Sequence, residues 1–118
     1  MRYAAFLLLY VPAACAANPL ANTSWIETPG TECPHAITFE TTTYTYFNDC
    51  YALGSDGVIE VGRFAVANSE LLLLERTMTG PSNFEYWPKD MSRVRIVEVD
   101  DDHLVLEAGS RVTRLERR

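Results

Sequence analysis

Residues 54–67 read GSDGVIEVGRFAVA, and this stretch decides the fold class. The pair Asp56-Gly57 is a strong short-range hairpin signal, because tight hairpin turns favour residues that tolerate a positive φ. The ten residues that follow are rich in β-branched and aromatic side chains, which pack well on a pleated surface. The sequence therefore predicts a β-hairpin here, with residues 58–67 as its returning strand.

Short β-rich runs separated by turn residues continue in both directions from this hairpin. In residues 36–41 the side chains alternate, with Ile37 and Phe39 on one face, as expected for a strand with one solvated side. The four leucines of 71–74 could nucleate a helix, but the run is short and lies between β signals. The strands that we predict are residues 23–28, 36–41, 43–52, 58–67, 70–79, 93–99, 103–107 and 111–115.

Eight short antiparallel strands in about 100 residues are most simply satisfied by an up-and-down barrel, because closure removes unpaired strand edges. A small barrel fills its interior with side chains or holds one small ligand, and we expect Trp25, Phe39 and Phe64 to point inward. Near the end of the chain, alternation changes phase at Val97, which indicates a β-bulge or an edge strand. Asp100-Asp101-Asp102 then provides the turn between two strands.

The first sixteen residues have the pattern of a secretory signal peptide. A basic start and an apolar run of about ten residues precede the small-residue exit Ala14-Cys15-Ala16, whereas a transmembrane helix needs about 20 apolar residues. We predict cleavage after Ala16, export to the periplasm or the outside, and a single domain over residues 17–118 with no transmembrane segment. Lipid attachment at Cys15 is the less favoured alternative, because Pro12 stands where a lipoprotein signal has a leucine-like residue.

Cleavage would leave two cysteines, Cys33 and Cys50, in a compartment where disulfides persist. Their spacing is not that of a redox or zinc motif, so a structural disulfide is expected. Loss of Arg2 would also leave nine basic against sixteen acidic side chains, a formal charge of −7. This acidity disfavours binding to nucleic acid or anionic lipid and favours a basic partner.

Motifs for catalysis, metals or cofactors are not evident in the sequence. His35 and His103 have no partner at ligand spacing and are interpreted as exposed loop histidines. The aspartate triplet at 100–102 lacks the spaced ligands of a calcium loop. We therefore expect a non-enzymatic protein with no cofactor and no metal site.

Residues 80–92 form the one long irregular segment, and it contains the aromatic group Phe84, Tyr86 and Trp87. Aromatic side chains in a loop on a rigid scaffold often contact a ligand or partner. The alternative is that they fold back and plug one end of the barrel. Both interpretations stay open at this point.

Taken together, the early Trp25, the strand with Phe39, the Tyr-rich third strand, the Asp-Gly hairpin and the late run RVRIVEVDDDHLVL from residue 93 are similar to small bacterial lipocalin-like proteins. This resemblance implies a small barrel with an apolar ligand. It also implies an arginine packed on the tryptophan, for which Arg111 and Arg114 are the two candidates.

Two functions are expected from these features. The first is a secreted or periplasmic protein that binds a small apolar ligand or an envelope component. The second is a periplasmic protein-interaction module, such as an immunity protein or an inhibitor of a basic envelope-acting enzyme. Fold alone does not choose between them.

Overall fold

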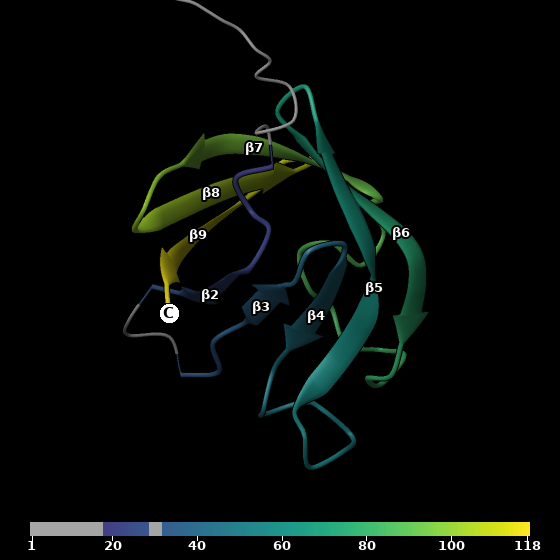
Figure 1. Cartoon of the computed structure of the whole chain (residues 1–118). Coiled ribbons are helices and arrows are strands. Elements are labelled where there is room, and N and C mark those ends of the chain that lie inside the picture. The colour runs from purple at the N-terminus through teal and green to yellow at the C-terminus, as the bar shows by residue number, and fades with distance from the viewer. Residues whose placement is uncertain (1–17, 29–31) are drawn as a thin grey trace, which may run out of the picture.

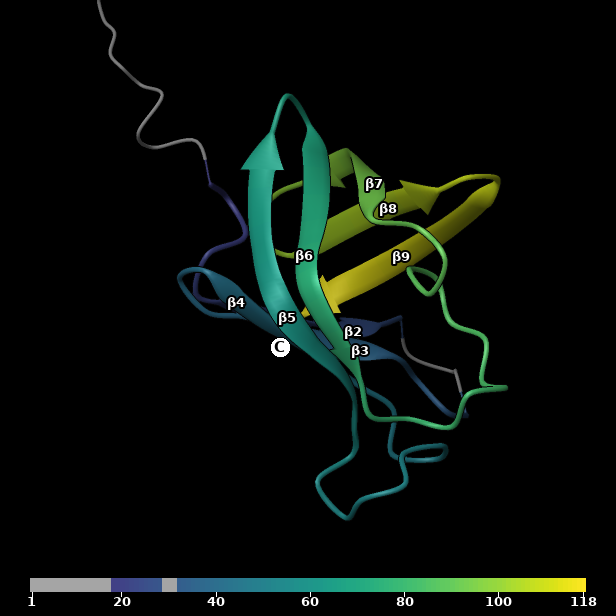
Figure 2. The same cartoon turned by 90° about the vertical axis from the view of Figure 1, so that its right-hand side faces the viewer.

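A computed structural model describes residues 18–28 and 32–118. The predicted signal peptide, its cleavage site and Cys15 lie outside the described residues. Eight strands form one closed antiparallel barrel in which each strand pairs with its neighbours in sequence and the last pairs with the first (Figures 1 and 2). The predicted all-β, up-and-down barrel is therefore confirmed. The strands are β2 (Thr23–Glu27), β3 (Ala36–Phe39), β4 (Thr43–Phe47), β5 (Val58–Ala67), β6 (Glu70–Met78), β7 (Arg93–Val99), β8 (His103–Ala108) and β9 (Arg111–Arg117).

The strand boundaries differ from prediction mainly at two places. β4 ends at Phe47, because Asn48 starts a turn in which its carbonyl accepts hydrogen bonds from the N–H groups of Tyr51 and Ala52. The Asp-Gly signal is therefore the end of a longer loop of residues 48–57, and Gly57 is its one residue with positive φ. β9 continues to Arg117, two residues beyond prediction, because it pairs with β2 up to Trp25.

Several local predictions are confirmed. The leucine run belongs to β6, and Leu71 and Leu73 point into the core while Leu74 is exposed. The pairing of β7 with β8 shifts register between Ile96 and Glu98, which is the bulge indicated by the change of phase. At the aspartate turn, the Asp100 carboxylate accepts hydrogen bonds from the backbone N–H groups of Asp102 and His103 at 2.8 and 2.7 Å.

β6 and β7 pair over three positions only, as do β2 and β9. Beyond Leu73, whose N–H bonds to the carbonyl of Ser92, β6 and β7 separate and residues 79–92 run between their ends (Figure 2). We call residues 79–92 the strap. The strap and the loop of residues 48–57 lie at the same end of the barrel, away from the β5–β6 hairpin (Figures 1 and 2).

Candidate functional site

The barrel interior is filled by a single apolar core. Trp25, Phe39 and Phe64 all belong to it, and the rings of Phe39 and Phe64 lie 4.8 Å apart. From the strap, Tyr86 and Trp87 are buried in the same core, whereas Phe84 is half-buried at its margin. The strap thus contributes side chains to the packing of this end of the barrel.

Trp25 has an arginine against its ring, but neither of the two predicted candidates occupies this position. The Arg117 guanidinium carbon lies 5.3 Å from the centre of the Trp25 ring. Trp25 and Arg117 are register partners on β2 and β9, so the extension of β9 determines which arginine reaches the ring. Arg111 and Arg114 are exposed.

A buried carboxylate, which the sequence prediction missed, lies next to the core residues Tyr44 and Tyr86. Glu60 on β5 has no solvent exposure. Its two oxygens accept hydrogen bonds from the Tyr44 hydroxyl, the Tyr86 hydroxyl and the Arg76 guanidinium, with Arg76 Nε and an Nη at 2.8 and 2.9 Å. All these partners are donors, so the negative charge is compensated and hydrogen-bonded, as a buried ion must be.

Arg76 reaches Glu60 because the β5–β6 ladder is irregular. Simple alternation from Leu71 and Leu73 would place Glu75 inward and Arg76 outward. Instead the register shifts opposite Gly62, and Glu75 takes a φ of 48°. This bulge turns Arg76 toward the interior and leaves Glu75 exposed.

Gly62 is required where Tyr44 crosses this bulge. A Cβ at Gly62 would lie 2.8 Å from the Leu74 carbonyl oxygen and 2.9 Å from the Tyr44 ring, closer than real Cβ atoms approach. The absence of a side chain therefore lets Tyr44 lie against β5 with its hydroxyl on Glu60.

The environment fixes the protonation of the groups around Glu60. Burial and the hydrogen bond to Glu60 raise the pKa of Tyr44 and of Tyr86, so both phenols keep their protons and donate. Burial acts to lower the pKa of Arg76, but the hydrogen bonds and charge of Glu60 outweigh it and raise that pKa.

The same arginine holds the strap. Its Nη atoms donate to the backbone carbonyls of Pro88 at 2.6 Å and Met91 at 2.9 Å, with a longer contact to Lys89. Tyr86 adds a second link from the strap to Glu60. The Glu60–Arg76 pair is therefore the anchor that fixes residues 86–91 to the barrel.

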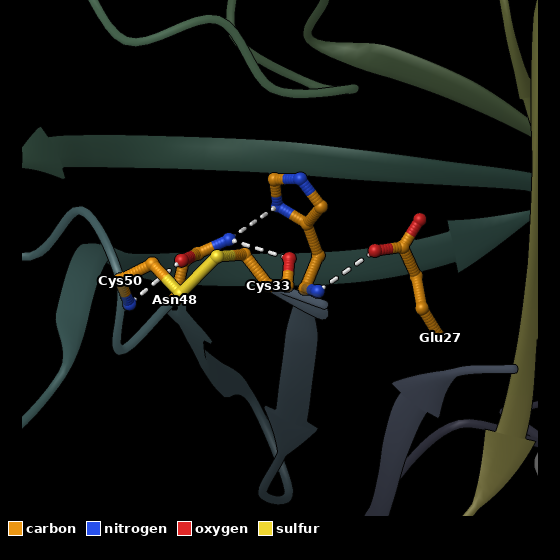
Figure 3. Close-up of a disulfide and its surroundings, with 5 residues drawn as sticks. Glu27, Cys33, Asn48 and Cys50 are labelled. Carbon is orange, nitrogen blue, oxygen red and sulfur yellow. Dashed lines mark hydrogen bonds between the residues drawn. A yellow bond between two sulfur atoms is a disulfide. The ribbon is translucent and has the colours of Figure 1, made fainter. Parts of the chain in front are cut away.

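A disulfide clamps the loop of residues 48–57. Cys33 and Cys50 are bridged with their Cα atoms 5.8 Å apart, as the cysteine count predicted (Figure 3). Asn48 holds the backbone of both bridged cysteines, because its Nδ2 donates to the Cys33 carbonyl and its Oδ1 accepts from the Cys50 N–H at 3.0 Å (Figure 3). The buried Asn48 side chain thus fixes the backbone on both sides of the bridge.

Stacked rings connect this loop to the strap. The Tyr51 ring stacks on Phe84 at 4.5 Å, and Phe84 stacks in turn on His35 at 5.7 Å and on Tyr86 at 5.6 Å. Loop and strap are therefore joined by one continuous aromatic stack, whose inner ring, Tyr86, bonds to Glu60.

His35 is not the exposed loop histidine that was predicted, whereas His103 is exposed. The Tyr46 hydroxyl lies 2.8 Å from His35 Nδ1, and Glu27 accepts a hydrogen bond from the His35 backbone N–H. Burial raises the pKa of Tyr46, so its phenol keeps the proton and donates to an unprotonated Nδ1. Burial also lowers the pKa of His35, an effect that the nearby charge of Glu27 opposes and that of Arg111 reinforces.

We expect this histidine to make stability depend on pH. Because its pKa is lower in the folded than in the unfolded chain, the unfolded chain takes up a proton first as pH falls. The free energy of unfolding should be constant above about pH 6.5 and decline as pH falls through that value, with a slope of at most about 1.4 kcal/mol per pH unit. Urea unfolding between pH 5 and 8 measures this decline.

The control for the pH measurement is His35→Gln, in which the amide oxygen can still accept from Tyr46. That variant should lose the decline between pH 6.5 and 5, whereas His103→Gln should keep it. An equal decline in the wild type and in His35→Gln would show that another group is responsible.

The tip of the clamped loop exposes apolar side chains that the sequence prediction did not single out. Leu53 is 74% exposed and Tyr51 is 49% exposed, although Tyr51 also stacks on Phe84. Asp49 and Asp56 flank them and are exposed as well. We call Asp49, Tyr51, Leu53 and Asp56 the loop surface. The signal that could have revealed it was the apolar pair Tyr51 and Leu53 directly before the turn residues of 54–57.

The charge is unevenly distributed along the sequence. Residues 3–62 contain six acidic side chains and not a single lysine or arginine, whereas all nine remaining basic side chains follow in residues 63–118. Within the described part of the chain, the salt bridges involve residues 60–107 only. The carboxylates of Asp49 and Asp56 therefore have no salt-bridge partner among those residues.

Within residues 18–28 and 32–118, there is no group of three or more histidine, cysteine, aspartate or glutamate side chains that could hold a metal ion. In the same residues, no helix has the length and apolar character needed to cross a membrane.

Fold and site together define a small closed antiparallel barrel with a filled interior, an ion-paired strap and a disulfide-clamped acidic loop. Comparison of the chain with protein-family models, with curated proteins and with solved structures gives no match. The function is therefore argued from the site itself.

Proposed function

We propose that this chain is an exported, lipocalin-like, non-enzymatic protein-interaction module that binds a basic partner protein through its loop surface. The observation that carries the proposal is the exposure of Leu53 and Tyr51 on a loop fixed by the Cys33–Cys50 disulfide and Asn48. Side chains on a rigid loop bind with little loss of conformational entropy, and tyrosine is enriched among the residues that dominate the energy of protein interfaces.

The charge distribution supports a basic partner. The loop surface lies in the part of the chain that has no basic side chain, and its aspartates have no salt-bridge partner among the described residues. Complementary charge on the partner would steer association and remove the repulsion among these carboxylates. An envelope-acting enzyme of high isoelectric point has this chemistry.

A small apolar ligand inside the barrel stays a prediction with less support. Trp25, Phe39 and Phe64 pack in the interior together with Tyr86 and Trp87. A hollow of about 220 Å³ lies beside Tyr86, Ile59 and Met78 and opens at the surface, but it is smaller than typical ligand pockets of about 300 Å³ or more.

Site-specific photocrosslinking in the organism that encodes the protein tests the proposal. A photoreactive benzoyl-phenylalanine at exposed Ser55 would sit in the loop without replacing Tyr51 or Leu53. We expect a single covalent adduct whose partner, identified by mass spectrometry, is a basic exported protein. The adduct should be reduced at least about tenfold by Leu53→Ser, because loss of an interface anchor costs about 2 kcal/mol or more.

The matched control places the same photoreactive residue at Val97, which is 45% exposed on β7 at a distance from the loop. That position should give no such adduct. The proposal is overturned if Ser55 gives no adduct, if the adduct at Val97 is the same, or if the partner crosslinked through Ser55 is acidic.

A further inference from the structure

A groove lies on the outer face of β2, β3 and β4 beside the disulfide. Its volume is about 470 Å³ and it opens at the surface, a size within the range of binding pockets of about 300–1,000 Å³. Ile26, Ala36 and Phe47 are register neighbours across the three strands and form an apolar floor, with Pro34 beside them. Thr38, Asn48 and Arg118 also line the groove. Asp49 and Cys50 of the clamped loop also line it, so the groove is continuous with the loop surface.

The disulfide determines the charge of one side of this groove. Glu32 and Asp49 each come directly before a bridged cysteine, and the Cα atoms of the two cysteines are 5.8 Å apart. The bridge therefore holds two exposed carboxylates at one wall. Neither has a salt-bridge partner among residues 18–28 and 32–118. Like charges placed together repel, and a cation between them removes that repulsion.

We propose that the groove binds a lysine or arginine side chain of the basic partner. The aliphatic stem of such a side chain would cover Ile26, Ala36 and Phe47, while its charged end would lie beside Glu32 and Asp49. Long basic side chains combine an apolar stem with a charged head, and this combination matches a groove with an apolar floor and an acidic wall. The inference deepens the proposed function and rests on it.

Two other occupants fit the groove less well. A metal ion would have two carboxylates at most and would leave the apolar floor without a role. An anionic ligand would have Arg118 as its one cationic neighbour and would face Glu32 and Asp49. A basic side chain uses both the floor and the acidic wall.

The inference can be tested without the partner, by titrating the isotope-labelled protein with blocked amino acids and recording amide NMR spectra. The probes are the N-acetyl methylamides of lysine and arginine, with those of norleucine and glutamate as controls. We expect both basic probes to shift the amide signals of Ala36, Thr38 and Cys50 at millimolar concentration. Norleucine should bind more weakly and glutamate should not bind.

Substitutions at the acidic wall complete the test. Asp49→Asn and Glu32→Gln should each weaken binding of the lysine probe by about two- to fivefold, the range for an exposed charge pair. The double variant should bind the lysine and norleucine probes equally. Glu98→Gln should bind like the wild type, because Glu98 is exposed on β7, which pairs with none of β2, β3 and β4. Both substituted carboxylates are exposed, so the variants are expected to fold.

Several outcomes would overturn the inference. These are no shift of the groove signals with either basic probe, equal shifts with norleucine, or unchanged binding in the double variant. A basic partner crosslinked at Ser55 together with silent groove signals would remove the groove inference and leave the proposed function. Binding of the basic probes without any adduct at Ser55 would remove the proposed function and leave the groove as a site for basic side chains.

Discussion

Replacing Arg76 with methionine should destabilise the protein by about 3–5 kcal/mol, because it leaves the buried Glu60 carboxylate without its countercharge. The strap would also lose the hydrogen bonds that Arg76 donates to the carbonyls of Pro88 and Met91. Urea unfolding measures the loss of stability. Hydrogen exchange should show that amides of residues 84–91 lose much more protection than the lower overall stability accounts for. Amides of β8 should lose only the protection that the lower overall stability accounts for.

The same substitution at an exposed pair provides the control for the Arg76 prediction. Arg93 pairs with Glu70 at the surface, so Arg93→Met should cost less than about 1 kcal/mol. The double variant Glu60→Gln/Arg76→Met keeps an oxygen that can accept from Tyr44 and Tyr86 but removes the buried charge. It should therefore be more stable than Arg76→Met alone. If Arg76→Met costs no more than Arg93→Met, the Glu60–Arg76 pair does not anchor the strap.

Removing the disulfide should have the second largest effect. For bridged residues separated by 17 positions, the loop-entropy model gives a stabilisation of about 3 kcal/mol, and Cys33→Ala/Cys50→Ala should lose about this amount. The variant should also give less of the Ser55 adduct, because the loop surface is no longer fixed before binding. Urea unfolding and the crosslinking yield measure the two effects separately.

Reduction of the wild type is the control for the disulfide prediction. Dithiothreitol should lower the stability of the wild type to that of the double cysteine variant and leave the variant itself unchanged. A loss below about 1 kcal/mol in the variant would show that Asn48 and the aromatic stack hold the loop without the bridge. If the variant is destabilised but gives a normal adduct yield, the disulfide stabilises the fold and is not needed to fix the loop surface for binding.

Much of the fold could be predicted from the sequence because strand signals are local. Residue type, alternation and turn residues together located all eight strands, and Phe39 and Phe64 point inward as predicted. The change of phase at Val97 indicated the β7 bulge. The pairing of Cys33 with Cys50 followed from the cysteine count once Cys15 was assigned to the signal peptide.

The candidate site was less predictable because it depends on contacts between distant segments. Glu60 shares the phase of Phe64, a signal that could have indicated an inward carboxylate but was not used, and the identity of its partners could not be deduced from alternation. Arg76 has the wrong phase for the interior and reaches Glu60 only because Glu75 is bulged. Likewise, Arg117 rather than Arg111 or Arg114 contacts Trp25 because of the β2–β9 register.

The sequence by itself determined the all-β class, the order of the strands and the disulfide, since each depends on residue type and spacing along the chain. Only the tertiary structure decided that the interior is filled, that Glu60 and Arg76 anchor the strap, and that Leu53 and Tyr51 are exposed beside an acidic groove. The physical reason is that barrel closure and the bulge at Glu75 set which side chains meet. These contacts join residues far apart in the sequence, and no local pattern encodes them.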